Sequence, residues 1–216
     1  VNFTITVSAA PIISYVNPSV YTVGTAIPSL QPTVSGTVTS LAITPSLPAG
    51  LNFNTITGAI TGTPSVAISA TSYAVTATNV YGSGTATLTI TAGLAPSNVS
   101  YTISNPSLTV GQAMLPISPS VSAGSGTLTY TVSPSLPAGL SIHPSTGVIS
   151  GTPSIAMATG SYTVTVTSVF GNTSTVLSLA TGVAPIGLSY SAPPTFTVGA
   201  VISALTPTVQ NTVSSW

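Results

Sequence analysis

Long stretches of this sequence recur 89 residues further along the chain. The run Ser72–Thr78 (SYAVTAT) returns as Ser161–Thr167 (SYTVTVT), and Leu47–Leu51 (LPAGL) returns unchanged as Leu136–Leu140. A constant offset over separated stretches shows that a whole unit is repeated. Each unit has to be one structural module, so the chain is predicted to fold as a tandem array.

Inside each unit, apolar residues alternate with Ser and Thr, and turn-forming residues return about every 8–12 positions. Alternation with a period of two is typical of strands with one buried face, and Thr favours strands because it is β-branched. We therefore predict an all-β fold of tandem β-sandwiches. The side chains expected in the two cores are those of Tyr73, Val75, Ala77, Leu88 and Ile90, with Tyr162, Val164, Val166, Leu177 and Leu179 as their counterparts.

The 216 residues include no Lys, Arg, Asp or Glu, whereas about a quarter of an ordinary domain is charged. Acid–base catalysis, calcium sites and zinc sites draw on carboxylates, His and Cys, and this chain has one His and no Cys. Nucleic-acid binding needs basic side chains. The composition predicts that the protein is not an enzyme, has no metal or cofactor and does not bind nucleic acid.

One third of the chain is Ser (34) or Thr (38), so a disordered or mucin-like stalk has to be considered. Hydrophobic residues nevertheless make up 43%, more than a disordered tract contains. A membrane-spanning helix needs about 20 consecutive apolar residues, and Ser, Thr, Gly or Pro interrupts every such run within a few positions. We expect a folded protein without membrane insertion.

In the second unit, a segment that joins two predicted strands contains glycines and a proline that are expected to determine its backbone conformation. Gly147 and Gly151 are expected to supply turn or bulge geometry that other residues adopt at a cost, and Pro153 is expected to end a strand. Leu140 and Ile149 are expected to fill the core on either side.

Two runs in this unit carry a family resemblance. Leu136–Pro153 (LPAGLSIHPSTGVISGTP), followed by Gly160–Thr167 (GSYTVTVT), resembles the immunoglobulin-like tandem repeat family of large bacterial surface and secreted proteins, adhesins among them. The resemblance implies immunoglobulin-like β-sandwiches. The motif is also similar to cadherin-like domains, but those place acidic calcium ligands at their boundaries, and this sequence has none.

The repeat divides the chain into four parts. Residues 1–10 align with the last strand of a preceding repeat, 11–93 and 94–183 are two complete repeats, and 184–216 is the start of a further, incomplete repeat. We expect the two end segments to be completed by protein outside this sequence. Covalent continuation into flanking repeats and strand donation between subunits both fit, and continuation is favoured because one donated strand cannot replace the strands missing from the last part.

The lone histidine, His143, lies between Ile142 and Pro144 and is aligned with Asn54. A catalytic or ligand-binding histidine needs partners that this chain lacks, so an exposed loop residue is the favoured interpretation. Serines are abundant, but a serine without a base is not activated. The glycine-flanked Ser83 lacks the nucleophile-elbow pattern, and Gly82–Gly84 is interpreted as a hairpin turn.

Three Asn-x-Ser/Thr sequons begin at Asn2, Asn98 and Asn172 and are candidate N-glycosylation sites. With so many Ser and Thr residues, some sequons arise by chance. A glycan coat would supply the hydration that charges normally provide.

Three aromatic residues, Tyr21, Tyr81 and Phe170, could stack on sugars. The favoured interpretation is that they fill the ends of sandwiches or the joints between domains, because sugar sites usually add charged and polar partners.

Together these features favour an extracellular structural protein at the cell surface, forming a stalk, fibre, filament or adhesin. Its expected partners are neighbouring repeats or identical subunits, because a net charge near zero favours self-association, and glycans are a further candidate. The alternative function is a carbohydrate-binding or accessory module of a large secreted protein.

Overall fold

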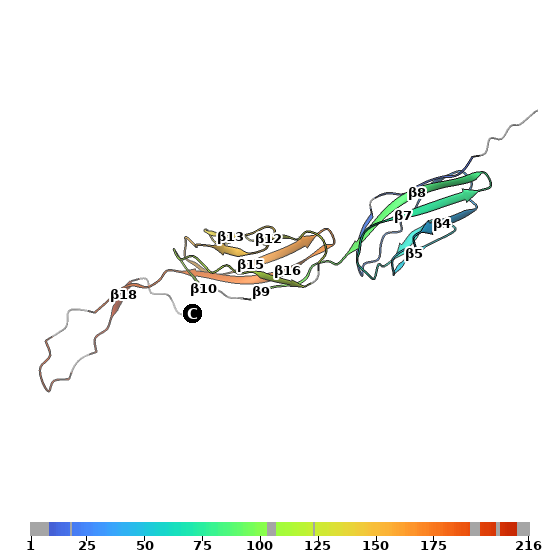
Figure 1. The fold of residues 1–216 in the computed structure, drawn as a ribbon. Helices are drawn as coiled ribbons and strands as arrows, with labels where there is room; N and C mark the ends of the chain where they lie inside the picture. The colour runs from blue at the N-terminus through green and yellow to red at the C-terminus, as the bar shows by residue number, and fades with distance from the viewer. Residues whose placement is uncertain are drawn as a thin grey trace, which may run out of the picture. The chain divides into compact units, whose positions relative to one another are not determined.

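Every regular element in the described part of the chain is a β-strand (Figure 1). The computed structural model describes residues 9–17, 19–102, 107–122, 124–190, 195–201 and 204–210. This architecture confirms the all-β prediction. Strands β1 to β8 form the first repeat and β9 to β16 form the second.

The first repeat is built on a four-stranded sheet in the order β2-β8-β7-β4, with two smaller antiparallel pairs, β1-β3 and β5-β6. Its strands are β1 (Ile12–Ser14), β2 (Ser19–Thr22), β3 (Thr33–Ser35), β4 (Ser40–Thr44), β5 (Leu51–Phe53), β6 (Ile60–Gly62), β7 (Ile68–Asn79) and β8 (Gly82–Gly93). Strand β2 runs parallel to β8, whereas β4 and β8 are antiparallel to β7.

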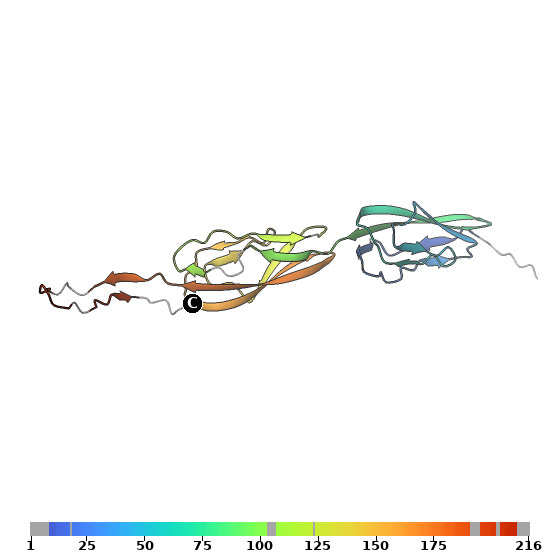
Figure 2. The same cartoon turned by 90° about the horizontal axis from the view of Figure 1, so that it is seen from below.

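Strands β7 and β8, of 12 residues each, form an antiparallel hairpin, and they are the longest strands of this repeat (Figure 1, Figure 2). Asn79 pairs with Gly82, so the turn between the strands consists of Val80 and Tyr81. The prediction that Gly82–Gly84 forms the turn was therefore wrong by two residues. Gly82 instead begins β8 with a φ of 143°, a backbone conformation that other residues rarely adopt.

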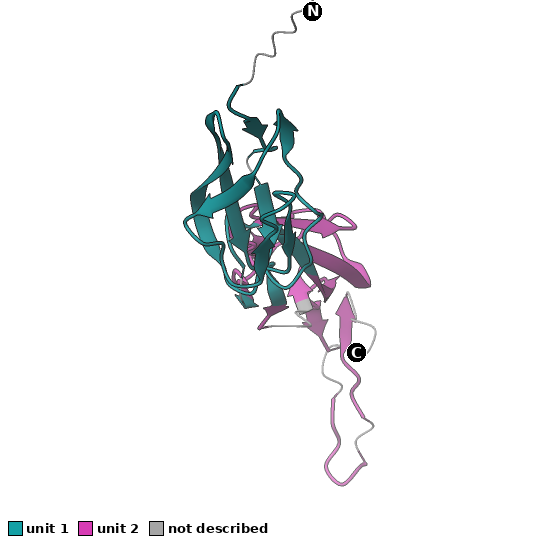
Figure 3. Cartoon of the chain, turned by 90° about the vertical axis from the view of Figure 1, so that its right-hand side faces the viewer, with its two compact units in different colours: residues 1–98, 121–128, 166–173 teal, residues 99–120, 129–165, 174–216 magenta. Residues whose placement is uncertain are grey.

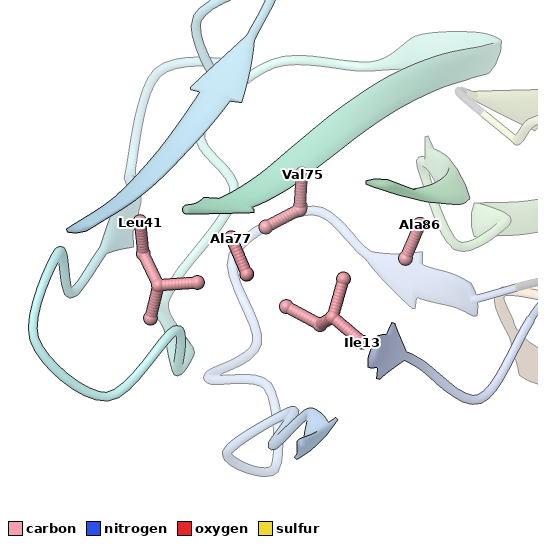
Figure 4. Packing of buried hydrophobic residues seen from close by; sticks show 5 residues of the cluster. All are labelled: Ile13, Leu41, Val75, Ala77 and Ala86. Atoms are coloured by element: carbon pink, nitrogen blue, oxygen red, sulfur yellow. The ribbon is translucent and has the colours of Figure 1, made fainter. Parts of the chain in front are cut away.

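The alternating pattern of the hairpin places its apolar residues in the core. Tyr73, Val75, Ala77, Leu88 and Ile90 are all buried, as predicted. Val75 and Ala77 of β7 point toward Ile13, Leu41 and Ala86 from β1, β4 and β8 (Figure 4). Interleaved Thr residues lie on the other face of the sheet, where they are more exposed.

The second repeat has the same kinds of sheet: a four-stranded sheet in the order β10-β16-β15-β12 and the pairs β11-β9 and β13-β14. Its strands are β9 (Ser97–Tyr101), β10 (Ser107–Thr109), β11 (Pro119–Ser122), β12 (Thr129–Ser133), β13 (Leu140–Ile142), β14 (Ile149–Gly151), β15 (Met157–Ser168) and β16 (Gly171–Gly182). The predicted core residues of this repeat, Tyr162, Val164, Val166, Leu177 and Leu179, are also buried.

The segment around β13 and β14 agrees with the sequence interpretation at all but one position. Gly147 and Gly151 have φ values of 70° and 133°, Pro153 follows β14, and Ile149 is fully buried. Leu140, expected in the core, is only half-buried, although its counterpart Leu51 is buried.

Two glycines allow a close approach of backbone to backbone that no other residue permits. A Cβ atom added to Gly50 would lie 1.9 Å from the carbonyl oxygen of Thr63, and one added to Gly139 would lie 1.9 Å from that of Thr152. Both glycines have positive φ values, near 90°. The recurring Leu-Pro-Ala-Gly-Leu sequence is therefore a backbone requirement as well as a core one.

Contacts divide the chain into two compact units (Figure 3). Unit 1 contains residues 1–98 together with 121–128 and 166–173, and unit 2 contains the remainder. The division does not coincide with the sequence repeat, because two turn regions of the second repeat belong to unit 1.

After the second repeat, strand β17 (Ile186–Ser189) pairs antiparallel with β18 (Thr208–Gln210). The pairing is of the same kind as that of β1 with β3. Phe196, Val198 and Leu205, which lie between these two strands, are exposed. Residues 1–8 lie outside the described part of the chain, so the assignment of 1–10 to the last strand of a preceding repeat stays a prediction.

Candidate functional site

Among the described residues, no group of three or more His, Cys, Asp or Glu side chains comes together as a metal site requires. The described part of the chain also has no helix long and apolar enough to cross a membrane. The features that remain as candidates are His143, the sequons, the hydroxyl-bearing sheet face and the aromatic residues at the ends of the repeats.

His143 is an exposed loop residue, as expected, and its ring organises a turn. Its Nδ1 atom accepts hydrogen bonds from the backbone N–H groups of Ser145 (3.3 Å) and Thr146 (3.2 Å). Asn54 makes the same two bonds in the first repeat through its Oδ1 atom, at 2.9 and 3.0 Å. His143 thus replaces a turn-capping amide, which is a structural role.

In each repeat, a tyrosine hydroxyl donates a hydrogen bond to the backbone of this turn. The hydroxyl of Tyr15 donates to the carbonyl oxygen of Gly58, and that of Tyr101 donates to the carbonyl oxygen of Gly147, both at 2.6 Å. Burial raises the pKa of Tyr15 to about 12. Burial, with a smaller contribution from Tyr130, raises the pKa of Tyr101 to about 12 as well. Sequence reasoning missed both tyrosines, because their partners are backbone atoms more than 40 residues away.

Two of the three sequon asparagines are described, and both are exposed. Asn98 lies in β9 with a φ of 51°, and Asn172 lies in β16, just after the turn that follows β15. Asn2 lies outside the described residues. The candidate glycan sites of the second repeat are therefore on its surface.

The outer face of the β7–β8 hairpin carries hydroxyl groups in register. Ser72 pairs with Thr89, Thr76 with Thr85, and Thr78 with Ser83. The last two pairs bring hydroxyl oxygens within 3.4 and 2.8 Å of each other. Cross-strand hydroxyl pairs of this kind stabilise a sheet, so this face is polar and uncharged.

The three aromatic candidates lie in different environments. Tyr21 is half-buried and packs against the core cluster that contains Ile60 and Leu88. Phe170 is 7% exposed, whereas its counterpart Tyr81 is 60% exposed. The interpretation that these residues fill ends and joints is confirmed for Tyr21 and Phe170.

Phe170 is buried by contacts inside unit 1, to which residues 166–173 belong. A Cβ atom at Gly93 would lie 2.4 Å from Cε2 of Phe170, so the ring sits directly against this glycine. The Thr22 hydroxyl donates to the Phe170 carbonyl oxygen (2.7 Å). Leu94 and Ser125 add two bonds: the Leu94 N–H donates to Ser125 Oγ (3.0 Å), and the Ser125 N–H donates to the Leu94 carbonyl oxygen (2.8 Å).

We call the turn that carries Tyr81 or Phe170 the aromatic turn. The glycine end is the region formed by Thr22–Gly24 with Gly93, or by Thr109–Gly111 with Gly182.

A cavity of about 320 Å³ lies beside the glycine end at Gly93, where the Phe170 ring packs. The residues that line this cavity are Ala67, Ile68, Ser69, Thr91, Ala92, Ser125, Gly126 and Phe170. The polar residues of this lining are Ser69, Thr91 and Ser125, and none of its side chains is charged. Sugar sites usually add several convergent polar or charged partners to an aromatic ring.

The fold defines a class of protein, one built from tandem immunoglobulin-like β-sandwiches. A sequence profile of the family described as "Putative Ig domain" matches residues 2–93 and 95–184. The chain belongs to this family, which confirms the resemblance inferred from the repeat motif. No curated protein sequence matches the chain.

Solved structures with several immunoglobulin domains have the same fold. An I-band fragment of titin is 15% identical, with a TM-score of 0.56 over 83% of this chain and 68% of that one. Extracellular domains 3–5 of Drosophila OTK are 12% identical, with a TM-score of 0.56 over 79% and 60%. The eight N-terminal immunoglobulin domains of Down Syndrome Cell Adhesion Molecule are 16% identical, with a TM-score of 0.55 over 87% and 26%. These likenesses support the fold.

Proposed function

We propose that this chain is a segment of an extracellular structural array, a stalk, fibre or surface filament built from immunoglobulin-like repeats. The single observation that carries the proposal is the packing of Phe170 on Gly93, with the Thr22 hydroxyl bonded to the Phe170 carbonyl group. Both residues belong to unit 1, so this compact unit combines residues from two consecutive repeats. Consecutive repeats that share a compact unit suit a mechanical or spacing role.

The composition of the surface supports the same role. A protein without charged side chains has no long-range repulsion between neighbouring molecules. Its exposed sheet face presents paired Ser and Thr hydroxyls. Immunoglobulin-like domain families are generally structural or adhesive, and the described residues contain no cluster of metal-binding or charged catalytic groups.

The repeat boundaries follow from the same proposal. We assign 11–93 and 94–183 to complete repeats and 184–216 to the opening of another, because β17 and β18 pair as β1 and β3 do. The exposed apolar residues Phe196, Val198 and Leu205 would be covered by further protein.

Glycosylation is part of the proposal at Asn98 and Asn172, which are exposed, and at Asn2. Mass spectrometry of the native protein, before and after enzymatic removal of N-glycans, should show a mass loss. The Asn98→Gln and Asn172→Gln variants should each lose one glycan. A native mass equal to that of the bare chain would contradict this part.

Immunogold labelling of intact cells of the source organism tests the localisation. An antibody raised against residues 11–183 should label the surface without permeabilisation, while an intracellular marker stays unlabelled. Labelling that requires permeabilisation would overturn the extracellular assignment. The carbohydrate-binding alternative has no comparable observation in its favour.

A further inference from the structure

The second repeat closes the end of its last strand with a hydrogen bond of its own. The hydroxyl of Thr181, the residue before the end of β16, donates to the carbonyl oxygen of Ile155 (2.6 Å), and Thr181 is only 3% exposed. The bond joins the end of β16 to the segment that leads into β15. Because the buried hydroxyl has a partner, it stabilises the packing of the two segments.

The first repeat has no such hydroxyl at this position. The counterparts of Thr181 and Ile155, 89 residues earlier, are Ala92 and Val66. Ala92 is buried and lines the cavity of about 320 Å³ beside the glycine end at Gly93. The contacts that close this end come instead from Phe170, whose ring packs on Gly93 and whose carbonyl oxygen accepts the Thr22 hydroxyl (2.7 Å). A residue of the second repeat therefore completes the end of β8.

The turn that carries Phe170 is continuous with the core of its own repeat. Residues 166–173 belong to unit 1, whereas the rest of β15 and β16 belongs to unit 2. These two strands are neighbours in one sheet and contribute the buried side chains of Val164 and Leu177. The turn is formed only while β15 and β16 are paired, so Phe170 meets Gly93 only while the second repeat is folded.

We propose that Phe170 couples the unfolding of the two repeats. Its packing on Gly93 supplies in the first repeat the closure that Thr181 supplies in the second, and it is lost when either repeat unfolds. A coupling free energy is reciprocal, so the contact stabilises both repeats by the same amount. The inference rests on the same packing as the proposed function and adds how the folding of one repeat supports the next.

Hydrogen exchange of the full 216-residue chain tests the coupling, because amide exchange reports the opening of each region separately. The amides of Tyr73–Ala77 and Leu88–Ile90 report on the first repeat, and those of Tyr162–Val166 and Leu177–Leu179 on the second. Phe170→Ser should accelerate exchange at least about tenfold, as expected for loss of a buried aromatic side chain. The factor should be the same for the amides of both repeats.

Thr22→Val is a milder variant of the same contact. It removes the hydroxyl that bonds the Phe170 carbonyl oxygen and leaves the ring in place. Exchange should accelerate in both repeats by a smaller common factor, about tenfold or less for one hydrogen bond. This variant keeps the test decisive if Phe170→Ser does not fold.

Tyr81→Ser is the matched control. Tyr81 lies in an equivalent turn, where its N–H donates to Asn79 Oδ1 (2.8 Å) as the Phe170 N–H donates to Ser168 Oγ (3.1 Å). Tyr81 is 60% exposed, whereas Phe170 is 7% exposed. The control should leave exchange in both repeats at the wild-type rate, and circular dichroism should show that all variants are folded.

Ala92→Thr tests whether the two closures are equivalent. It gives the first repeat the hydroxyl that the second repeat has at Thr181, and Ala92 lines a cavity with room for the added atoms. Added to Phe170→Ser, it should slow exchange in the first repeat several-fold. The second repeat should keep the fast exchange of the single variant, because the new bond lies within the first repeat and does not restore the contact.

Three results would overturn the proposal. They are accelerated exchange in the second repeat alone, an equal acceleration in Tyr81→Ser, and a folded double variant whose first repeat exchanges as fast as in Phe170→Ser. Surface labelling of cells does not depend on exchange rates, so failure of the coupling and failure of the extracellular role are distinguishable.

Discussion

The two repeats of this chain fold alike, but matched residues at their ends lie in different surroundings. Their core positions keep the same types of residue, and Ile60 and Ile149 are both fully buried. The turn-capping position holds Asn54 in one repeat and His143 in the other. The aromatic turns carry Tyr81 and Phe170, of which only the second is buried.

This contrast separates two kinds of constraint. Positions inside a repeat are restricted by backbone contacts and close packing, which are the same in both copies. Positions at the ends of a repeat are restricted by the residues that pack on them, and these residues differ between the two copies. Substitutions at matched positions can therefore distinguish residues that stabilise the sandwich itself from residues that stabilise the packing of Phe170 on Gly93.

The largest effect is expected at the glycines that approach another strand. Gly50→Ala or Gly139→Ala places a Cβ atom 1.9 Å from a carbonyl oxygen at a positive φ, so each should cost at least about 4 kcal/mol of unfolding free energy or prevent the affected repeat from folding. Gly24→Ala is the control and should cost about 1 kcal/mol. Gly24 also has a positive φ, but among the described residues no atom lies within 4 Å of where its Cβ would be. Calorimetry would measure both. Equal costs would refute the close-approach argument.

Core truncation should act equally in the two repeats. Ile60→Ala and Ile149→Ala each remove a fully buried side chain and should cost about 2–5 kcal/mol. Ile56→Ala, at an exposed position in the same repeat as Ile60, should change stability by less than about 0.5 kcal/mol. Urea unfolding would provide the comparison, and a difference of several kcal/mol between the two core variants would show that the cores are not equivalent.

The pH dependence should be flat in acid and steep in alkali. The chain has no carboxylate side chain or lysine, so melting temperatures at pH 3 and pH 8 should agree within a few degrees. The pKa of Tyr15 and of Tyr101 is raised to about 12 from the ordinary value of 10. A raised pKa means that the stability is fully present below about pH 10 and is lost as the pH rises through 12.

Phenylalanine variants test the alkaline limb. The double variant Tyr15→Phe, Tyr101→Phe should be less stable at neutral pH, because one part-buried and one buried hydrogen bond are lost, at about 1 kcal/mol each. Between pH 10 and 12 it should lose less stability than the wild type. Parallel curves for the two proteins would exclude these tyrosines as the cause.

The packing of Phe170 on Gly93 predicts that alanine substitution has different effects on stability at the two matched glycines, Gly93 and Gly182. Gly93→Ala directs a Cβ atom at the Phe170 ring, while a Cβ atom at Gly182 would meet no atom of the described residues within 4 Å. The first should cost about 1–3 kcal/mol, as overpacking does, and should increase hydrogen exchange near Phe170. The second should be close to neutral. Similar costs for both would mean that Phe170 does not rest on Gly93 in solution.

The smallest effect is expected at the lone histidine. His143→Asn restores the residue that caps the equivalent turn, where the hydrogen bonds are shorter. Stability should rise by a few tenths of a kcal/mol, within the range of a surface substitution. Asn54→His is the reciprocal control and should lower stability by a similar amount. A large loss in His143→Asn would reveal a role for the imidazole that the turn does not explain.

The amino-acid sequence alone determined the strand content, the repeat and the identity of the core. Alternation of apolar residues with Thr and Ser is a local property, and a strand turns every second side chain to the same face. Tyr73, Val75 and Ala77 were therefore predictable from their spacing. The glycine signals at Gly147 and Gly151 were predictable because a positive φ is a property of one residue.

Tertiary structure decided the features that depend on distant partners. Tyr81 and Phe170 occupy equivalent turns, yet their exposure differs because only Phe170 meets a glycine end. The hydroxyls of Tyr15 and Tyr101 bond to carbonyl oxygens far along the chain. Leu140 is half-buried although its counterpart Leu51 is buried, and strand register places the turn at Val80 and Tyr81. Burial and register are set by which surfaces meet in space, and a local pattern carries no information about the other surface.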